Sequence, residues 1–88
     1  MVALRIVDDF FQESSIVVVQ GTRVVWVNDG SEVHSATSMN AADSWDTGIL
    51  KSGQSGGHTF SLPGSYFYTC KVHEYMTASI RVLPGPNG

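Results

Sequence analysis

Short apolar runs separated by turn residues recur along the whole chain. No window of useful length repeats apolar residues at helical spacing. The runs that we expect to form strands are residues 4–7, 16–19, 23–28, 34–38, 58–62, 65–70 and 77–83. Short strands at such close spacing are typical of an antiparallel sandwich or barrel. The pattern therefore predicts an all-β fold of seven to eight strands.

Two of these runs indicate where the core lies. Residues 16–19 are β-branched throughout, which predicts a strand that is buried on both faces. Trp26 lies within the run 23–28, and we expect its ring in the core. Beyond the last run, the Pro- and Gly-rich residues 84–88 form a tail that cannot extend the strand.

Residues 39–57 are the least regular part of the sequence. Only Trp45 and the pair Ile49 and Leu50 are expected to be buried there. The Ser- and Gly-rich residues 52–57 have the composition of a loop.

The composition predicts one globular domain over residues 1–88. A chain of 88 residues with 42% hydrophobic and 10% aromatic residues can build a single core, and 15% charged residues are too few to favour disorder. No apolar run approaches the roughly 18 residues of a membrane helix, so we expect no membrane insertion. The net charge of −3 argues against a nucleic-acid partner.

The N-terminal residues lack the basic and apolar segments of a signal peptide. This fits either a cytoplasmic protein or a mature form that begins at Met1, and the residues alone do not separate the two.

Cys70 is the single cysteine of the chain and lies at the end of an alternating aromatic strand. One cysteine excludes a disulfide framework, an iron–sulfur cluster and a zinc ribbon. His73 follows three residues later and Met76 three residues after that. A thiolate, an imidazole and a thioether therefore share one short loop between two predicted strands.

These donor types are those of a blue-copper centre, in which two histidines and one cysteine bind copper with a weak axial methionine. The loop supplies three of the four, and His34 is the leading candidate for the second histidine. Four side-chain ligands leave no open position for a substrate. The set therefore points to electron transfer rather than catalysis.

The sequence resembles the cupredoxins, the small blue-copper proteins that include plastocyanin, pseudoazurin and amicyanin. The resemblance runs from about Phe11 to Val82. The matching features are residues 16–21, 24–28, 46–48 and 63–66, with His34, Cys70, His73 and Met76. The short Cys-x₂-His-x₂-Met spacing is the one typical of amicyanin.

The resemblance implies a Greek-key β-sandwich with one type 1 copper ion per chain. It assigns His34, Cys70 and His73 as strong ligands and Met76 as the axial ligand, and it implies that the Ser35 N–H donates to the cysteine sulfur. The exposed edge of His73 would pass the electron. The implied protein is a monomeric, extracytoplasmic carrier between redox partners, such as a c-type cytochrome or a copper or quinoprotein enzyme.

The region of the loop departs from its relatives in two places. Glu74 stands where they often have proline, and Ala78 stands where they often have glycine. Together with Asp29 and Glu32, Glu74 forms either an ordinary solvated rim or an acidic border that steers a basic partner, although Lys71 lies in the same region.

His58 and Tyr75 have no single interpretation. His58 shares a strand face with Phe60 and Leu62, so it is a core histidine, a surface residue at a strand end or a group behind a ligand; we do not expect it to bind metal. Tyr75 either packs against the loop or belongs to a docking patch.

Two other functional classes fit less well. A copper chaperone or storage domain usually has several Met or Cys residues, whereas this chain has three Met and one Cys. A multicopper oxidase has histidines on both sides of the cysteine, whereas the neighbours here are Thr69 and Lys71. Zinc could occupy the same donors, and we interpret it as a substitute for copper.

Overall fold

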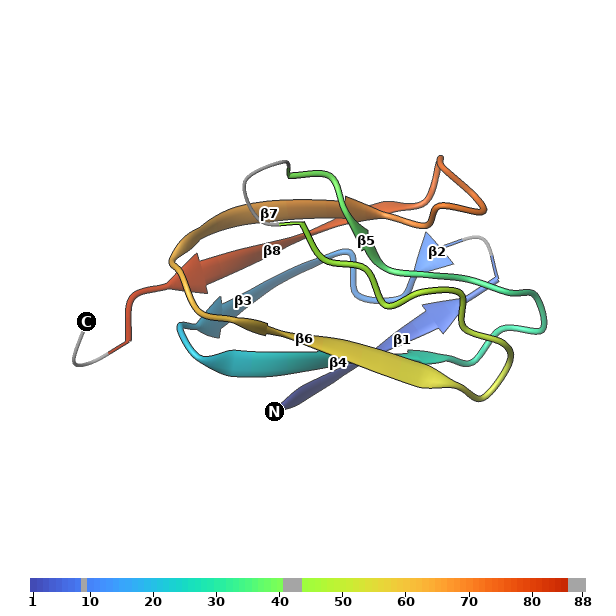
Figure 1. Cartoon of the computed structure of the whole chain (residues 1–88), viewed down its shortest axis with the longest axis horizontal. Helices are drawn as coiled ribbons and strands as arrows, with labels where there is room; N and C mark the ends of the chain where they lie inside the picture. The colour runs from blue at the N-terminus through green and yellow to red at the C-terminus, as the bar shows by residue number, and fades with distance from the viewer. Residues whose placement is uncertain (9, 41–43, 86–88) are drawn as a thin grey trace.

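The computed structural model describes residues 1–8, 10–40 and 44–85, and in these ranges eight strands form two facing sheets (Figure 1). One sheet, in the order β2–β1–β4–β6, consists of β1 (Val2–Val7), β2 (Phe10–Phe11), β4 (Thr22–Asn28) and β6 (Ser55–Phe60). The other, in the order β3–β8–β7–β5, consists of β3 (Ser15–Val19), β5 (Thr37–Ser38), β7 (Gly64–Thr69) and β8 (Thr77–Leu83). The predicted all-β sandwich is confirmed. The described ranges contain no helix of the length and apolarity needed to cross a membrane.

The connections cross between the two layers, as in a Greek-key sandwich. The consecutive strands β3 and β4 belong to different sheets, and Gly21, with φ of 90°, makes the turn between them. β1 pairs in parallel with β4, and β3 pairs in parallel with β8. β7 runs antiparallel to β8, and the segments that follow β1, β4 and β7 all emerge at the same end of the molecule, on the right in Figure 1.

Aromatic side chains fill the space between the sheets. Trp26 and Tyr68 are fully buried, and their rings meet edge to face at a centroid distance of 5.3 Å. Trp45 stacks on Trp26 at 5.0 Å, and Phe60 packs against both tryptophans. Aromatic pairs of this kind each contribute about 0.5–1.5 kcal/mol beyond the area they bury. The prediction that Trp26 and Trp45 belong to the core is confirmed.

The prediction that residues 16–19 are buried on both faces is wrong. Val18 is buried, but Val17 and Val19 are 60% and 52% exposed. β3 is an edge strand of a two-layer sandwich, so its alternate side chains point away from the core into solvent. The β-branched run reflects the preference of these residues for strands rather than double burial.

The irregular region also differs from its prediction. Leu50 is buried, but Ile49 is 47% exposed. Residues 55–57, expected in a loop, belong to β6. A Cβ on Gly57 would lie 2.8 Å from the Val24 carbonyl oxygen, so glycine is needed for the close approach of β6 to β4 and does not mark a loop.

Strand boundaries shift elsewhere as well. The predicted strand 34–38 is reduced to β5, and His34 instead forms an isolated bridge with Leu50. The short strand β2 was not predicted. The parts of the predicted irregular region and tail at residues 41–43 and 86–88 lie outside the described residues.

Candidate metal centre

The loop of residues 70–76 joins β7 to β8 and is folded back on itself. The Cys70 N–H donates to the Met76 carbonyl at 3.1 Å, and the Met76 N–H donates to the His73 carbonyl at 2.9 Å. The Thr69 hydroxyl, at the end of β7, also donates to the Met76 carbonyl, at 2.8 Å. These bonds hold the first and last residues of the loop together, so that Cys70 and Met76 both lie buried at its base.

His34 comes from the segment between β4 and β5 and is fully buried. Its N–H donates to the Leu50 carbonyl at 3.0 Å, and its own carbonyl accepts the Leu50 N–H at 2.7 Å. This two-way pairing fixes the backbone of His34 against a distant part of the chain. The imidazole lies beside Cys70 of the 70–76 loop.

Three donor atoms converge on one point. His34 Nδ1 lies 3.8 Å from Cys70 Sγ, and His73 Nδ1 lies 3.8 Å from the same sulfur. The three atoms all lie within 4.8 Å of one another. The structure thus brings together the residues that the sequence proposes as strong ligands, from two loops 36 positions apart.

Met76 is the fourth residue of the predicted set. Its side chain is 2% exposed and belongs to the same core cluster as Cys70. The grouping of two histidines, one cysteine and one methionine resembles a type 1 copper site. The axial role of Met76 stays a prediction.

The surroundings of Cys70 favour the thiolate. Burial raises the pKa of the thiol, whereas hydrogen bonds from the Ser35 N–H and from His73 lower it. The Ser35 N–H contact is the one that the family resemblance implies. The contact with Cys70 in turn raises the pKa of His73.

Asp8, directly after β1, contacts the far side of the His34 ring. Its Oδ1 lies 3.0 Å from His34 Nε2, and the same carboxylate accepts hydrogen bonds from the Ser31 hydroxyl and from the N–H groups of Ser31 and Glu32. These hydrogen bonds hold the pKa of Asp8 well below its usual value, and the one from the Ser31 hydroxyl has the largest effect. The sequence does not single out Asp8, because an aspartate after a strand is an ordinary turn residue.

The charged residues around the centre are mostly paired. Lys71 pairs with Asp46 at 2.6 Å, and Glu32 Oε1 lies 3.3 Å from His73 Nε2. The His73 side chain is 17% exposed, and the exposed ring of Tyr75 meets it at 6.1 Å. Of the residues proposed for an acidic border, Glu32 therefore contacts a predicted ligand directly.

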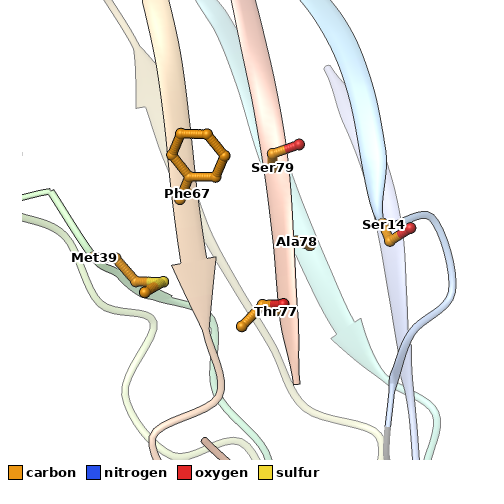
Figure 2. A pocket seen from close by; sticks show the side chains of 6 residues that line it. All are labelled: Ser14, Met39, Phe67, Thr77, Ala78 and Ser79. Carbon is orange, nitrogen blue, oxygen red and sulfur yellow. The ribbon is translucent and has the colours of Figure 1, made fainter. Parts of the chain in front are cut away.

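His58 lies outside the donor cluster. Its ring stacks on Trp45 at 5.2 Å, and it is half-buried beside the core. A hollow lies between β7, β8 and the segment before β3 (Figure 2). Met39, Phe67 and Thr77 line it together with Ser14, Ala78 and Ser79, and none of these is a predicted ligand.

Comparison with known proteins identifies the architecture. No family model matches the chain, and neither does any curated protein. A reduced, Cu(I) form of an amicyanin variant superimposes with a TM-score of 0.86 at 21% identity, over 92% of this chain and 80% of that one. An oxidised amicyanin variant gives 0.85 at 20% identity, with the same coverage. The chain has the cupredoxin fold.

A purple cupredoxin from Nitrosopumilus maritimus matches this fold over its whole length. The TM-score is 0.84 at 22% identity, over 93% of this chain and 99% of that one. Identities this low show the cupredoxin fold alone. Only the donor atoms of this chain therefore indicate whether it binds a metal.

The donor chemistry fits copper. His34 Nε2 lies 3.0 Å from the Asp8 carboxylate, and Nδ1 lies on the side of Cys70 Sγ. In the cupredoxin fold of this chain, the Cys70 thiol faces the imidazoles of His34 and His73. A thiolate with two imidazoles is the strong ligand set of blue-copper sites.

Proposed function

We propose that this protein is a small electron carrier whose type 1 copper ion is held by His34, Cys70, His73 and Met76. The observation that carries the proposal is the meeting of His34 Nδ1, Cys70 Sγ and His73 Nδ1 within 4.8 Å. Bound copper would supply a one-electron couple between Cu(II) and Cu(I). Four side-chain ligands leave no position for a substrate, which supports a carrier rather than an enzyme.

The protein's own part is to fix the donors before the ion arrives. The pairing of His34 with Leu50 and the folded 70–76 loop hold donors on both sides of the site. Preformed donors reduce the rearrangement that accompanies a change of charge on the ion. Cu(II) and Cu(I) would then meet the same arrangement of donor side chains.

We further propose that the electron passes through the exposed edge of His73, beside the exposed side chains of Val72 and Tyr75. A small docking surface suits brief encounters with redox partners. Following the family resemblance, we propose a single domain over residues 1–88, a monomer, an extracytoplasmic location and partners such as a c-type cytochrome or a copper or quinoprotein enzyme.

A copper titration followed by visible absorption tests the proposal. One equivalent of Cu(II) should give an intense thiolate-to-copper charge-transfer band, and Cys70→Ser and His34→Gln should abolish it. His58→Gln, which changes a histidine outside the donor cluster, is the matched control and should retain the band. A colourless wild-type protein after stoichiometric Cu(II) binding would refute the proposed function.

A further inference from the structure

Asp8 occupies a position that the sheet topology creates. β1 and β4 pair in parallel with Ile6 opposite Asn28, so the two strands end side by side. The carboxylate of Asp8 therefore meets the segment that leads from Asn28 to His34. It contacts His34 Nε2 at 3.0 Å, the Ser31 N–H at 3.0 Å, the Ser31 hydroxyl at 2.7 Å and the Glu32 N–H at 3.0 Å.

Hydrogen bonds of Asn28 hold the segment after β4 in a conformation that leaves room for this carboxylate. The buried Asn28 amide donates to the carbonyls of Glu32 and Leu50, both at 2.8 Å, and its oxygen accepts the Gly30 N–H at 2.9 Å. A Cβ on Gly30 would lie 2.2 Å from Asp8 Oδ1. The carboxylate thus occupies space that only a glycine at position 30 leaves open.

The contacts determine which nitrogen of His34 carries the proton. Two N–H groups and one hydroxyl donate to Asp8, so the carboxylate acts as an acceptor. His34 Nε2 must then donate, which leaves Nδ1 bare on the side of Cys70. The ring is fully buried, so water does not compete for either nitrogen.

We propose that Asp8 is a positioning residue of the metal centre, which fixes the tautomer of His34 and strengthens Nδ1 as a donor. This rests on the proposed function. A carboxylate behind a histidine ligand increases the basicity of the coordinating nitrogen. The more highly charged Cu(II) gains more from this than Cu(I), so Asp8 lowers the reduction potential.

Glu32 and His73 form a weaker version of the same arrangement. Glu32 Oε1 lies 3.3 Å from His73 Nε2, and the Glu32 side chain is 53% exposed. The Asp8 and His34 side chains are 34% and 0% exposed, whereas those of Glu32 and His73 are 53% and 17% exposed, so water competes more strongly for the second contact. Asp8 is therefore the carboxylate whose loss should matter more.

The test compares Asp8→Asn with Asp29→Asn. Asp29 pairs with Arg5 at the same end of the molecule, so its variant removes the same charge without touching a predicted ligand. For Asp8→Asn the ratio of Cu(II) to Cu(I) affinity should fall about tenfold. For a one-electron couple this raises the potential by about 59 mV. A shift no larger than that of Asp29→Asn would overturn the proposal.

A second measurement needs no copper. Ring ¹⁵N NMR of the metal-free wild type should show His34 protonated at Nε2 and bare at Nδ1, and Asp8→Ala should mix the two tautomers. Ser31→Ala removes one donor to Asp8 but keeps the carboxylate on His34, so it should leave the tautomer unchanged. A structural role for Asp8 alone would give destabilised variants with an unchanged tautomer.

The two readouts separate the possible failures. If the Asp8 variants do not fold, the wild-type spectrum still decides, because a proton on Nδ1 would overturn the inference. If the wild type forms no blue site but has the expected tautomer, the proposed function fails while the role of Asp8 in orienting His34 stands.

Discussion

The imidazole of His34 shows how much of the candidate centre depends on single atoms. One of its nitrogens faces Asp8 and the other faces Cys70, so the orientation of one ring determines which donor the site presents. Cys70 likewise depends on its neighbours, because burial opposes the thiolate and the contacts around it favour the thiolate.

Replacement of Met76 tests the axial role. A leucine removes the thioether, which should destabilise Cu(II) and raise the reduction potential, whereas a glutamine oxygen favours Cu(II) and should lower it. Cyclic voltammetry of the three proteins measures both shifts. The exposed Met39, replaced by leucine, is the matched control. Unchanged potentials in both Met76 variants would remove Met76 from the ligand set.

At the scale of the element, the 70–76 loop is a short segment that its own hydrogen bonds hold closed. The Thr69 hydroxyl bonds to the carbonyls of Glu74 and Met76 at 3.0 and 2.8 Å. The Lys71 N–H donates to the Ser35 hydroxyl at 3.0 Å, which ties this loop to the His34 segment. The relative position of the donors thus depends on polar groups that do not themselves face the site.

Thr69→Val should loosen this loop. The substitution keeps the side-chain shape and removes the hydroxyl, so the free energy of unfolding should fall by about 1–2 kcal/mol. Bound copper should also transfer faster to a chelator. Urea unfolding and stopped-flow absorption measure the two effects. The exposed Thr59→Val on β6 is the control, and equal effects of the two variants would contradict the role of Thr69.

The pair of Asp46 and Lys71 should make stability depend on pH in the acid range. Burial raises the pKa of Asp46, but Lys71, the Gly48 N–H and the Thr37 hydroxyl outweigh it and hold the pKa below 3.8. The unfolded chain then takes up the proton first. The contribution of Asp46 is therefore present above the unfolded pKa and is lost as the pH falls through the folded one.

Asp46→Asn should remove this part of the acid sensitivity. The contribution is below about 1 kcal/mol because both side chains are partly exposed. Urea unfolding of the metal-free protein at a series of acid pH values measures it. Lys71→Met, which removes the partner charge, should also make the free energy of unfolding less dependent on pH in the acid range. Parallel wild-type and Asp46→Asn profiles would show that the pair contributes nothing.

The sequence allowed the 70–76 loop to be predicted because three donor types lie within seven residues of each other. Asp8 could not be predicted in this way. It is 26 residues from His34, and their contact depends on the parallel pairing of β1 with β4, which no local pattern encodes. The extent of β6 was missed because Gly56 and Gly57 read as loop residues, although β6 needs them to approach its neighbours closely.

At the scale of the whole molecule, the sandwich places three separate segments at one end. The donors come from the segments after β4 and β7, and Asp8 comes from the end of β1 (Figure 1). The aromatic core beneath them, with Trp26 and Tyr68 fully buried, supports this end from below. Because only the fold brings these separate segments together, folding and metal binding should be coupled.

Copper should stabilise the folded protein. Because the ligands come from distant parts of the chain, only the folded state presents them together, and free copper at about 1,000 times its dissociation constant adds about 4 kcal/mol. Thermal unfolding with and without copper measures this gain. Cys70→Ser should lose it and His58→Gln should keep it. An equal gain in Cys70→Ser would show that the ion binds elsewhere.

The unequal exposure of the two histidines has a consequence for metal exchange. Of the four predicted ligands, His34, Cys70 and Met76 are buried, whereas His73 shows an edge to solvent. An arriving ion would pass the His73 ring first, and a departing ion would pass it last. The side chain proposed to conduct electrons would thus also govern the lifetime of the cofactor, so a partner docked there would slow the loss of copper for as long as it stays.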